Sequence, residues 1–373
     1  MATPPSLTST LQSRVLQALA GNGGWLGFER FMELALYTPG LGYYARDDAI
    51  FGTSPSGADG HGSDFVTAPE MTPYFARTLA LPLAQALQAT GTREIWEFGA
   101  GSGALAAQLL QALGDQVQRY TIVDLSGALQ QRQRDALAAF GAKVRWVSEL
   151  PPAMRGVVVG NEVLDAMPVK LLLRKGGVWH ERGVAAGYAG ALVWRDMLTD
   201  LRPPLEIAGE HDYLTEVHLH AEAFMRTLAQ RLLQGAAFFI DYGFPEREYY
   251  HVQRAMGTVM CHRDHRMDAL PLDDVGQKDI TAHVNFTGLA LAAQDAGLGV
   301  GGLEVLGYTS QARFLLNCGL PGLLEHASVQ DQVMAHKLVM EHEMGELFKV
   351  LALCKGAPWD AIGFSQGDRT HTL

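Results

Sequence analysis

Residues 95–105, Ile-Trp-Glu-Phe-Gly-Ala-Gly-Ser-Gly-Ala-Leu, decide the fold of this chain. A short apolar strand runs into three glycines, Gly99, Gly101 and Gly103, and a helical pattern begins directly after them. Glycine permits a tight turn and allows the backbone to contact a ligand, while a helix N-terminus adds unpaired N–H groups and a partial positive charge. The stretch therefore predicts a strand, a cofactor-binding loop and a helix.

From residue 93 onward, strand and helix patterns alternate. Alternation at this spacing predicts βαβ units, a parallel sheet and right-handed crossovers. The predicted strands are 94–98, 120–124, 143–147, 156–160, 236–241, 303–308 and 347–353, and the predicted helices are 104–113, 128–140, 216–233 and 286–296.

Two further regions do not follow the alternation. The N-terminal part predicts helices over 8–19, 28–36 and 72–87, with a long loop rich in glycine, proline and serine over 38–63. Residues 169–197 contain short strand-like runs separated by glycine, which predicts an antiparallel insertion in the α/β framework.

The composition excludes several classes of protein. The chain has 373 residues with 40 acidic and 29 basic side chains, a formal net charge of −11 that argues against nucleic-acid binding. No apolar run approaches the roughly 20 residues of a membrane-spanning helix, so we expect no membrane insertion. The three cysteines are scattered, and Cys261-His262-x-x-His265 lacks a second cysteine pair, so we predict neither a disulfide framework nor a metal site.

The glycine loop fits two classes of cofactor. A G-x-G-x-x-A pattern that starts at Gly99 is compatible with a dinucleotide and an NAD(P)-dependent oxidoreductase. An E-x-G-x-G-x-G pattern that starts at Glu97 is typical of S-adenosylmethionine (SAM) methyltransferases, with the Glu97 carboxylate where the cofactor's ammonium group would lie. Asp124 ends the next strand, and its carboxylate can accept both hydroxyls of an adenosine ribose.

Polar side chains follow the fourth predicted strand. Asn161, Glu162 and Asp165 come directly after a buried apolar run. Ligands of open α/β sheets bind at the carboxyl ends of strands, so we expect these residues to face substrate, although Asn161 and Asp165 could equally cap the next helix.

Several segments resemble one family. The chain is similar to the MidA-type SAM-dependent methyltransferases, whose mitochondrial member methylates an arginine in a complex I subunit and supports assembly of that complex. The matching segments are 31–37, 40–44, 64–70, the glycine loop, 161–168, 240–243, 279–284 and 344–350, in family order.

The resemblance implies the architecture. It indicates an α/β fold with a Rossmann-like, seven-stranded SAM-dependent methyltransferase sheet, an N-terminal helical cover and an antiparallel β insertion, with 347–353 as the closing edge strand. We expect residues 1–90 to form the cover and 91–357 the methyltransferase domain, with the insertion at about 168–215. Residues 358–373 form a C-terminal tail.

The resemblance also selects SAM over a dinucleotide and assigns the cofactor contacts. We expect Glu162 and Asp165 to pair with a planar guanidinium acceptor, because two carboxylates can orient one nitrogen towards the methyl group. His283 lies at a later strand end and is a candidate acceptor for the released proton. The residues expected to bind the cofactor are Glu97, Gly99, Gly101, Gly103, Asp124, Thr67, Pro69, Glu70 and Asn161.

The predicted function is SAM-dependent methylation of a protein arginine, in a partner of the complex I subunit type. One alternative is a cofactor-binding assembly factor without essential catalysis, and the other is an NAD(P)-dependent oxidoreductase. We expect a bacterial protein of this kind in the cytoplasm and a eukaryotic one in the mitochondrial matrix. The sequence does not predict the oligomeric state.

Overall fold

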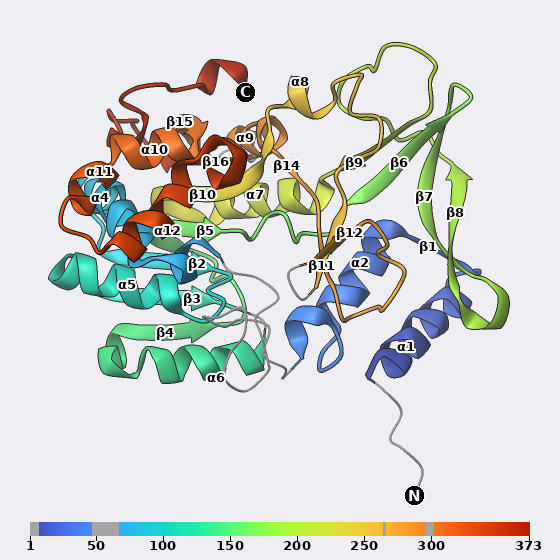
Figure 1. Cartoon of the computed structure of the whole chain (residues 1–373), viewed down its shortest axis with the longest axis horizontal. Helices are drawn as coiled ribbons and strands as arrows, with labels where there is room; N and C mark the ends of the chain where they lie inside the picture. Colours follow the sequence, from blue (N-terminus) through green and yellow to red (C-terminus); the bar gives the residue numbers. More distant parts are fainter. Residues whose placement is uncertain (1–6, 47–66, 125, 264–265, 296–300) are drawn as a thin grey trace, which may run out of the picture.

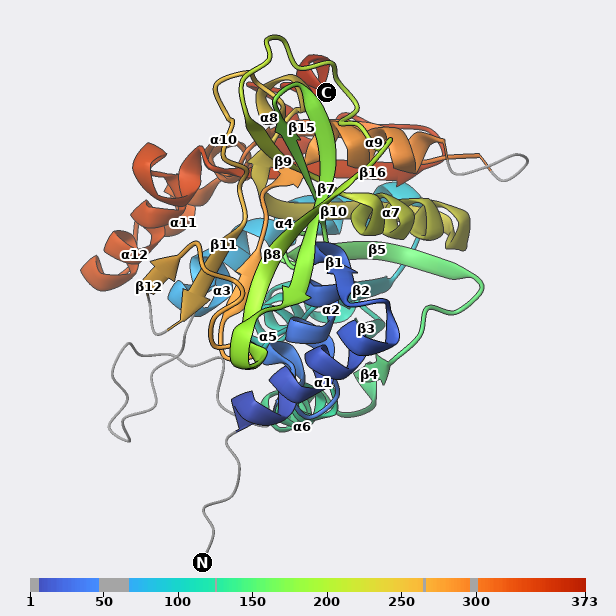
Figure 2. The same ribbon diagram turned by 90° about the vertical axis from the view of Figure 1, so that its right-hand side faces the viewer.

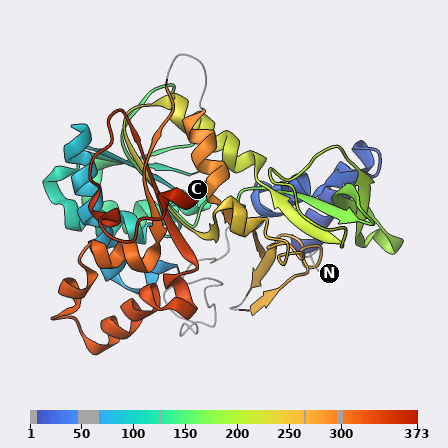
Figure 3. The same cartoon turned by 90° about the horizontal axis from the view of Figure 1, so that it is seen from above.

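Two lobes make up the molecule. The computed structural model describes residues 7–46, 67–124, 126–263, 266–295 and 301–373. A parallel-sheet lobe occupies one side, and a smaller lobe of N-terminal helices and antiparallel strands occupies the other (Figures 1 and 3). Residues 47–66 lie outside the described residues. They include residues 47–63 of the predicted loop and residues 64–66 of the segment 64–70 that matched the family.

The larger lobe is built on a sheet with the order β15-β16-β10-β5-β2-β3-β4. The strands β4, β3, β2, β5 and β10 are parallel to one another, as the alternating pattern predicted. Their bounds are β2 (Glu94–Phe98), β3 (Arg119–Val123), β4 (Val144–Val147), β5 (Met154–Asn161), β10 (Leu232–Phe244), β15 (Glu304–Ser310) and β16 (Phe348–Lys355).

One edge of this sheet differs from the expectation. β16 does not close the sheet, because it lies between β10 and β15 and is antiparallel to both. The edge strand is therefore β15, and the prediction for 347–353 is wrong in its position. The two-residue strand β14 (Val284–Asn285) also pairs with the end of β10, so the described sheet has eight strands rather than seven.

Helices cover both faces of the sheet, which explains its nearly continuous apolar strands. Neighbouring residues of one strand point to opposite sides, so Phe238 packs in one buried cluster and Phe239 in the other. One cluster includes α4 (Pro73–Thr90), α5 (Ala104–Leu113), α10 (Gln311–Asn317) and α12 (Val329–Val339), and the other includes α7 (Leu219–Arg231) and α9 (Phe286–Gln294).

The smaller lobe confirms the antiparallel insertion. Its sheet pairs four insertion strands with β1 (Trp25–Gly27) from the N-terminal region. The helices α1 (Leu7–Gly21) and α2 (Phe28–Tyr37) share a buried cluster with this sheet (Figure 2). The insertion strands are β6 (Lys170–Lys175), β7 (Val178–Ala186), β8 (Leu192–Leu198) and β9 (Tyr213–Val217). The helix predicted over 216–233 is shorter, because β9 and β10 take its two ends.

A third, small sheet was not predicted. It contains β11 (Met260–Arg263), β12 (Arg266–Asp268) and β13 (Asp279–Thr281). Cys261 and Ile280 of this sheet pack in the buried cluster of the smaller lobe, with Leu11 and Phe31. This segment leaves the end of β10 and returns to β14, so it links the smaller lobe to the sheet of the larger lobe.

The remaining elements are short. No helix in the described parts of the chain is long and apolar enough to cross a bilayer. The other α-helices are α3 (Ala68–Met71), α6 (Gly127–Ala136), α8 (Glu246–Tyr249) and α11 (Leu320–Leu324). Short 3-10 helices lie at η1 (Tyr43–Ala45), 114–116, 138–143, 188–190, 362–364 and 370–372, and a short π-helix lies at 341–345.

Candidate active site

A pocket of about 840 Å³ lies at the carboxyl ends of β2, β3 and β5. This is the edge at which open α/β sheets bind ligands. The glycine loop and residues 161–168 form one part of its wall, and residues of η1 and β13 from the smaller lobe form another. The pocket is therefore shared by the two lobes.

The glycine loop has the conformation that its sequence predicted. Gly99, Gly101 and Gly103 have φ angles of 63°, 53° and 86°, a region that side chains rarely adopt. A Cβ atom on Gly99 would lie 3.1 Å from Cγ2 of Val163. Gly103 is the N-cap of α5, so the loop leads directly into the first turn of that helix. At Gly99 and Gly101 the loop therefore presents its backbone to the pocket wall.

Two carboxyl groups frame this loop. Glu97 is buried, and burial, reinforced by Asp124, raises the pKa of its carboxyl to about 8, although a hydrogen bond from Tyr120 opposes the shift. Asp124 accepts from the Ser126 amide at 2.9 Å and from Gln133 Nε2 at 2.8 Å. Gln133 Nε2 also donates to the Gly101 carbonyl at 3.0 Å, so it ties the acid to the loop. Sequence reasoning did not identify Gln133.

Asn161 supplies an acceptor without a partner. Its Nδ2 donates to Glu162 Oε1 at 2.9 Å, while its buried Oδ1 has no hydrogen-bond donor in the described structure. Buried polar atoms are normally satisfied, so a free acceptor in a pocket wall favours a ligand with a donor group. The ammonium group of SAM is such a donor, and the carboxyl group of Glu97 lines the same pocket.

Three residues that follow the segment 47–66 also line the pocket. Thr67, Pro69 and Glu70 line it, next to the glycine loop. The Glu70 carboxyl accepts from the Ser102 side chain and the Thr67 backbone, and one of its oxygens is buried without a donor among the described residues. Burial is the main cause of the raised pKa of Glu70. All of the expected cofactor contacts except Gly103, which is the N-cap of α5, thus line one pocket.

The turn after β5 is held in place by a buried side chain that does not line the pocket. Glu162 has a φ angle of 54°, which is unfavourable for a residue with a side chain. The next three amides, of Val163, Leu164 and Asp165, all donate to Oδ2 of Asp241 at 3.2, 2.9 and 3.2 Å. Asp241 is fully buried in β10 and is not among the described residues that line the pocket. It orients the turn rather than contacting a ligand.

The turn presents two carboxyl groups to the pocket. Burial raises the pKa of Glu162 to about 8, and the neighbouring Asp165 contributes to the shift. Burial likewise raises the pKa of Asp165 to about 6. No cationic group of the described chain offsets either shift. A bound cation would favour the ionised forms, so this part of the pocket is suited to a positively charged substrate.

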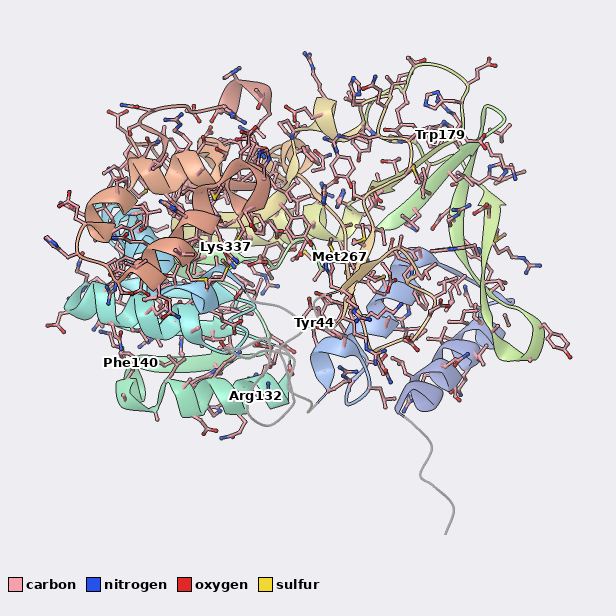
Figure 4. All side chains as sticks on the ribbon, in the orientation of Figure 1. Tyr44, Arg132, Phe140, Trp179, Met267 and Lys337 are labelled. Atoms are coloured by element: carbon pink, nitrogen blue, oxygen red, sulfur yellow. The ribbon has the colours of Figure 1, made fainter. Side chains whose placement is uncertain are left out.

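Sequence reasoning missed the aromatic wall of the pocket. The Tyr37 hydroxyl donates to the Ala166 carbonyl at 2.8 Å, and the Tyr44 hydroxyl donates to Asp279 Oδ2 at 2.8 Å. The two rings are stacked with centroids 5.7 Å apart. Figure 4 shows Tyr44 at the boundary of the two lobes. The segments 31–37, 40–44 and 279–284 carried the family resemblance, but nothing in the sequence placed them side by side.

The structure does not bring His283 to the carboxyl cluster. His283 is not one of the described residues that line the pocket. Its ring lies against Tyr242 and Phe244, with centroids 5.2 and 5.3 Å away. Burial, with Arg254 and Lys349, lowers the pKa of His283 to about 4. The prediction of a shared pocket therefore holds for Glu162 and Asp165 but not for His283.

Metal-ligating clusters are absent from the part of the chain that the structure describes. No group of three histidine, cysteine, aspartate or glutamate side chains there could hold an ion. His220 lines the pocket, where its Nε2 lies 3.0 Å from the Glu29 carboxylate.

Comparisons with known proteins show the family of this chain. A family model described as "putative S-adenosyl-L-methionine-dependent methyltransferase" matches residues 78–304. The mitochondrial protein arginine methyltransferase NDUFAF7 of Danio rerio is 24% identical over 399 residues, which cover 94% of this chain and 89% of that protein. The Homo sapiens protein of that name is 26% identical over 369 residues, which cover 87% and 78% of the two chains.

A solved structure matches over the whole chain. It is a protein of Burkholderia thailandensis bound to S-adenosyl-homocysteine, which is 46% identical to this chain with a TM-score of 0.92. The match covers 100% of this chain and 99% of the other. S-adenosyl-homocysteine is SAM without its methyl group, so the similarity includes the cofactor class.

Proposed function

Because this chain belongs to a family of S-adenosyl-L-methionine-dependent methyltransferases, we propose that it methylates a nitrogen of an arginine side chain in a protein. The cofactor is SAM. The acceptor is the new part of this statement, and it rests on the carboxyl groups of the turn after β5.

We assign cofactor binding to the residues around the glycine loop. The loop amides and the N-terminus of α5 suit the amino-acid part of SAM, together with Glu97 and the free Oδ1 of Asn161. Asp124 suits the ribose, because each carboxylate oxygen can accept more than one hydrogen bond. Thr67, Pro69 and Glu70 cover the cofactor from the N-terminal side.

The observation that carries the acceptor assignment is a pair of buried carboxyl groups, Glu162 and Asp165, for which no described cation offsets the raised pKa. Glu162 and Asp165 face the same pocket as the glycine loop, and their raised pKa values reflect burial without a cation. A guanidinium is planar and remains charged at all relevant pH values, so two carboxylates can bind its N–H groups in a fixed orientation. A neutral acceptor would supply no positive charge to favour the ionised forms of the two groups.

The chain's residues then align the reaction and receive a proton. When bound, SAM supplies a methyl group on a sulfonium, an electrophile that is already activated. The N–C bond forms as the S–C bond breaks, and the sulfur keeps the electron pair. The methylated guanidinium must then release one proton. The Glu162 carboxylate lies in the wall of the same pocket and can accept this proton.

The partner in this proposal is a protein of the complex I subunit type. The names of the mitochondrial relatives support a protein arginine as acceptor, and their coverage extends over both lobes. We place the enzyme where such a subunit is assembled, which is the cytoplasm of a bacterium or the mitochondrial matrix.

The test is methyl transfer with matched variants. Purified enzyme is incubated with labelled SAM and host lysate, and the protein fraction is hydrolysed and analysed for methylated amino acids. We expect methylarginine with the wild-type enzyme, and a loss of at least 100-fold with E162Q or D165N. The control is E210Q, which removes an exposed acid outside the pocket.

Affinity for the cofactor must be measured in parallel by calorimetry. The proposal requires E162Q and D165N to bind SAM nearly as well as the wild type. Label found only on lysine would contradict the proposal. Transfer to arginine by E162Q and D165N at the wild-type level would contradict it as well.

A further inference from the structure

The smaller lobe contributes a tyrosine–carboxylate pair to the pocket. Tyr44, in η1, and Asp279, at the start of β13, are 235 positions apart in sequence, yet the Tyr44 hydroxyl donates to Asp279 Oδ2 at 2.8 Å. Both side chains line the pocket, and Asp279 is only 4% exposed. The pair therefore places a buried carboxylate in the pocket wall.

This pair is connected to the turn that carries Asp165. The amide of Ala282, which follows β13, donates to the Asp165 carbonyl at 2.9 Å. The Tyr37 hydroxyl donates to the next carbonyl, of Ala166, at 2.8 Å. Backbone and side-chain bonds therefore fix Asp279 relative to Asp165 before any ligand binds.

The two carboxylates converge on the same aromatic rings. After burial, the charges of Asp279 and Asp165 are the largest causes of the raised pKa of both Tyr37 and Tyr44. The two rings are stacked at 23° between their planes. The wall thus combines negative charge with aromatic surface, the two features that bind a planar cation.

We propose that Asp279, oriented by Tyr44, forms the second half of the acceptor subsite and makes it specific for a guanidinium. This inference rests on the proposed function. A guanidinium carries five N–H donors in one plane, and Glu162 and Asp165 can satisfy only one side of it. Asp279 accepts from the remaining N–H groups, and the tyrosine wall lies along the flat cation.

The proposal distinguishes arginine from lysine. A lysine ammonium is a compact charge with three donors and cannot bridge carboxylates on two sides of a pocket as a planar fork does. Asp279 therefore contributes to the choice of acceptor, while the glycine loop binds the cofactor without it. Substitution of Asp279 should change acceptor binding and selectivity and leave SAM binding intact.

The experiment compares two peptides that differ only at the acceptor. They span the site that the wild-type enzyme methylates in host lysate, and they carry either arginine or lysine there. For D279N, we expect KM for the arginine peptide to rise 10-fold to 100-fold, as for loss of a charge-assisted hydrogen bond. Affinity for SAM should stay within about twofold, and the preference for arginine over lysine should fall.

Y44F provides a second variant that keeps the charge. It removes only the hydroxyl that orients Asp279, so we expect a smaller rise in KM, about threefold to tenfold. D273N is the matched control, since Asp273 is an exposed acid of the same segment and does not line the pocket. If D279N does not fold, the Y44F result decides.

The outcomes separate two failures. If the wild-type enzyme methylates arginine and D279N and Y44F keep wild-type KM and selectivity, the pair merely joins the lobes and the inference is wrong. If the wild-type enzyme methylates no arginine, the proposed function fails and the subsite fails with it. A loss of SAM affinity in Y44F equal to the loss of acceptor binding would also overturn the inference.

Discussion

At the scale of single residues, the site depends on a buried carboxylate that touches no ligand. Asp241 accepts three consecutive amide hydrogen bonds and holds Glu162 in a left-handed conformation. In the sequence, Glu162 and Asp165 follow a predicted strand, and in the structure both line the pocket. The hydrogen bonds from the turn to Asp241 join residues 76–78 positions apart and could not be read from spacing.

We predict that D241A is destabilised and inactive. The substitution removes the acceptor of the three turn amides and of the Tyr242 amide, at a cost of about 1–3 kcal/mol each as an upper range, and it releases the turn. D241N keeps one oxygen acceptor, so it should recover part of the stability and part of kcat. Chemical denaturation and kinetics measure both effects. Wild-type kcat in a folded D241A protein would disprove the positioning role.

The raised pKa of Glu162 predicts a pH-dependent stability in the cofactor-free enzyme. The folded state holds this proton up to about pH 8, whereas the unfolded chain loses it near the ordinary value of 4.5. The native state therefore binds more protons in this window, and its stability falls as pH rises from 5 to 8. E162Q does not titrate, so its free energy of unfolding should fall less and exceed that of the wild type at pH 8.

The measurement is urea denaturation of both proteins at pH 5 and pH 8 without SAM. S148A lies in the pocket wall but removes no titrating group, so it serves as the control. A difference between wild type and E162Q that is the same at both pH values would show that the Glu162 carboxyl is not desolvated.

At the scale of elements, the parallel strands were predictable and their order at one edge was not. Buried runs such as β5 and β10 are apolar on both faces, and this pattern is local. The position of β16 between β10 and β15 depends on pairing between distant segments, which no local pattern encodes. The strands β12 and β13 have only three residues each, too few for a periodicity, so their small sheet was missed.

The loop between β2 and α5 carries the next prediction. G99A adds a Cβ that would lie 3.1 Å from Val163 at a φ angle of 63°. We expect a cost of roughly 1–2 kcal/mol in stability and a loss of at least tenfold in SAM affinity, because the loop must shift. G177A, in the turn between β6 and β7, has a φ angle of 78° and free space around it. It should show similar strain with unchanged SAM affinity in calorimetry, and equal affinity losses would contradict the loop's role.

At the scale of the whole molecule, the pocket exists because two lobes meet. The N-terminal region was expected to cover the methyltransferase domain, and Tyr37 and Tyr44 do line its pocket. Within the smaller lobe, an ion pair of Lys170 with Glu29 at 3.4 Å joins the insertion to α2, and Lys170 also pairs with Glu181 of the insertion at 2.8 Å. We propose that the chain divides at about residue 90 into a cover and a methyltransferase domain. Within the cover region, α1 and α2 belong to the smaller lobe, whereas α4 packs on the methyltransferase sheet.

Cofactor binding should stabilise this two-lobed structure. A ligand that binds only the folded state at 100 times its Kd adds about 2.7 kcal/mol. SAM should therefore raise the midpoint of thermal unfolding, and NADH should not, because the cofactor class is that of the methyltransferases. Stabilisation by NADH at the same concentration would contradict the cofactor assignment.

Complementation of cells that lack the protein distinguishes an enzyme from an assembly factor without essential catalysis. A variant such as E162Q is expected to bind SAM without methyl transfer. If it nevertheless restores respiratory complex assembly in cells that lack the protein, assembly needs the cofactor-bound fold rather than catalysis.

The most direct test of the central claim is mass spectrometry of cells that lack the gene, complemented with either the wild-type chain or E162Q. We predict a methylated arginine in a protein partner with the wild-type chain and its absence with E162Q. Identical arginine methylation in both strains, or a wild-type-dependent methyl group only on another type of acceptor, would contradict the account.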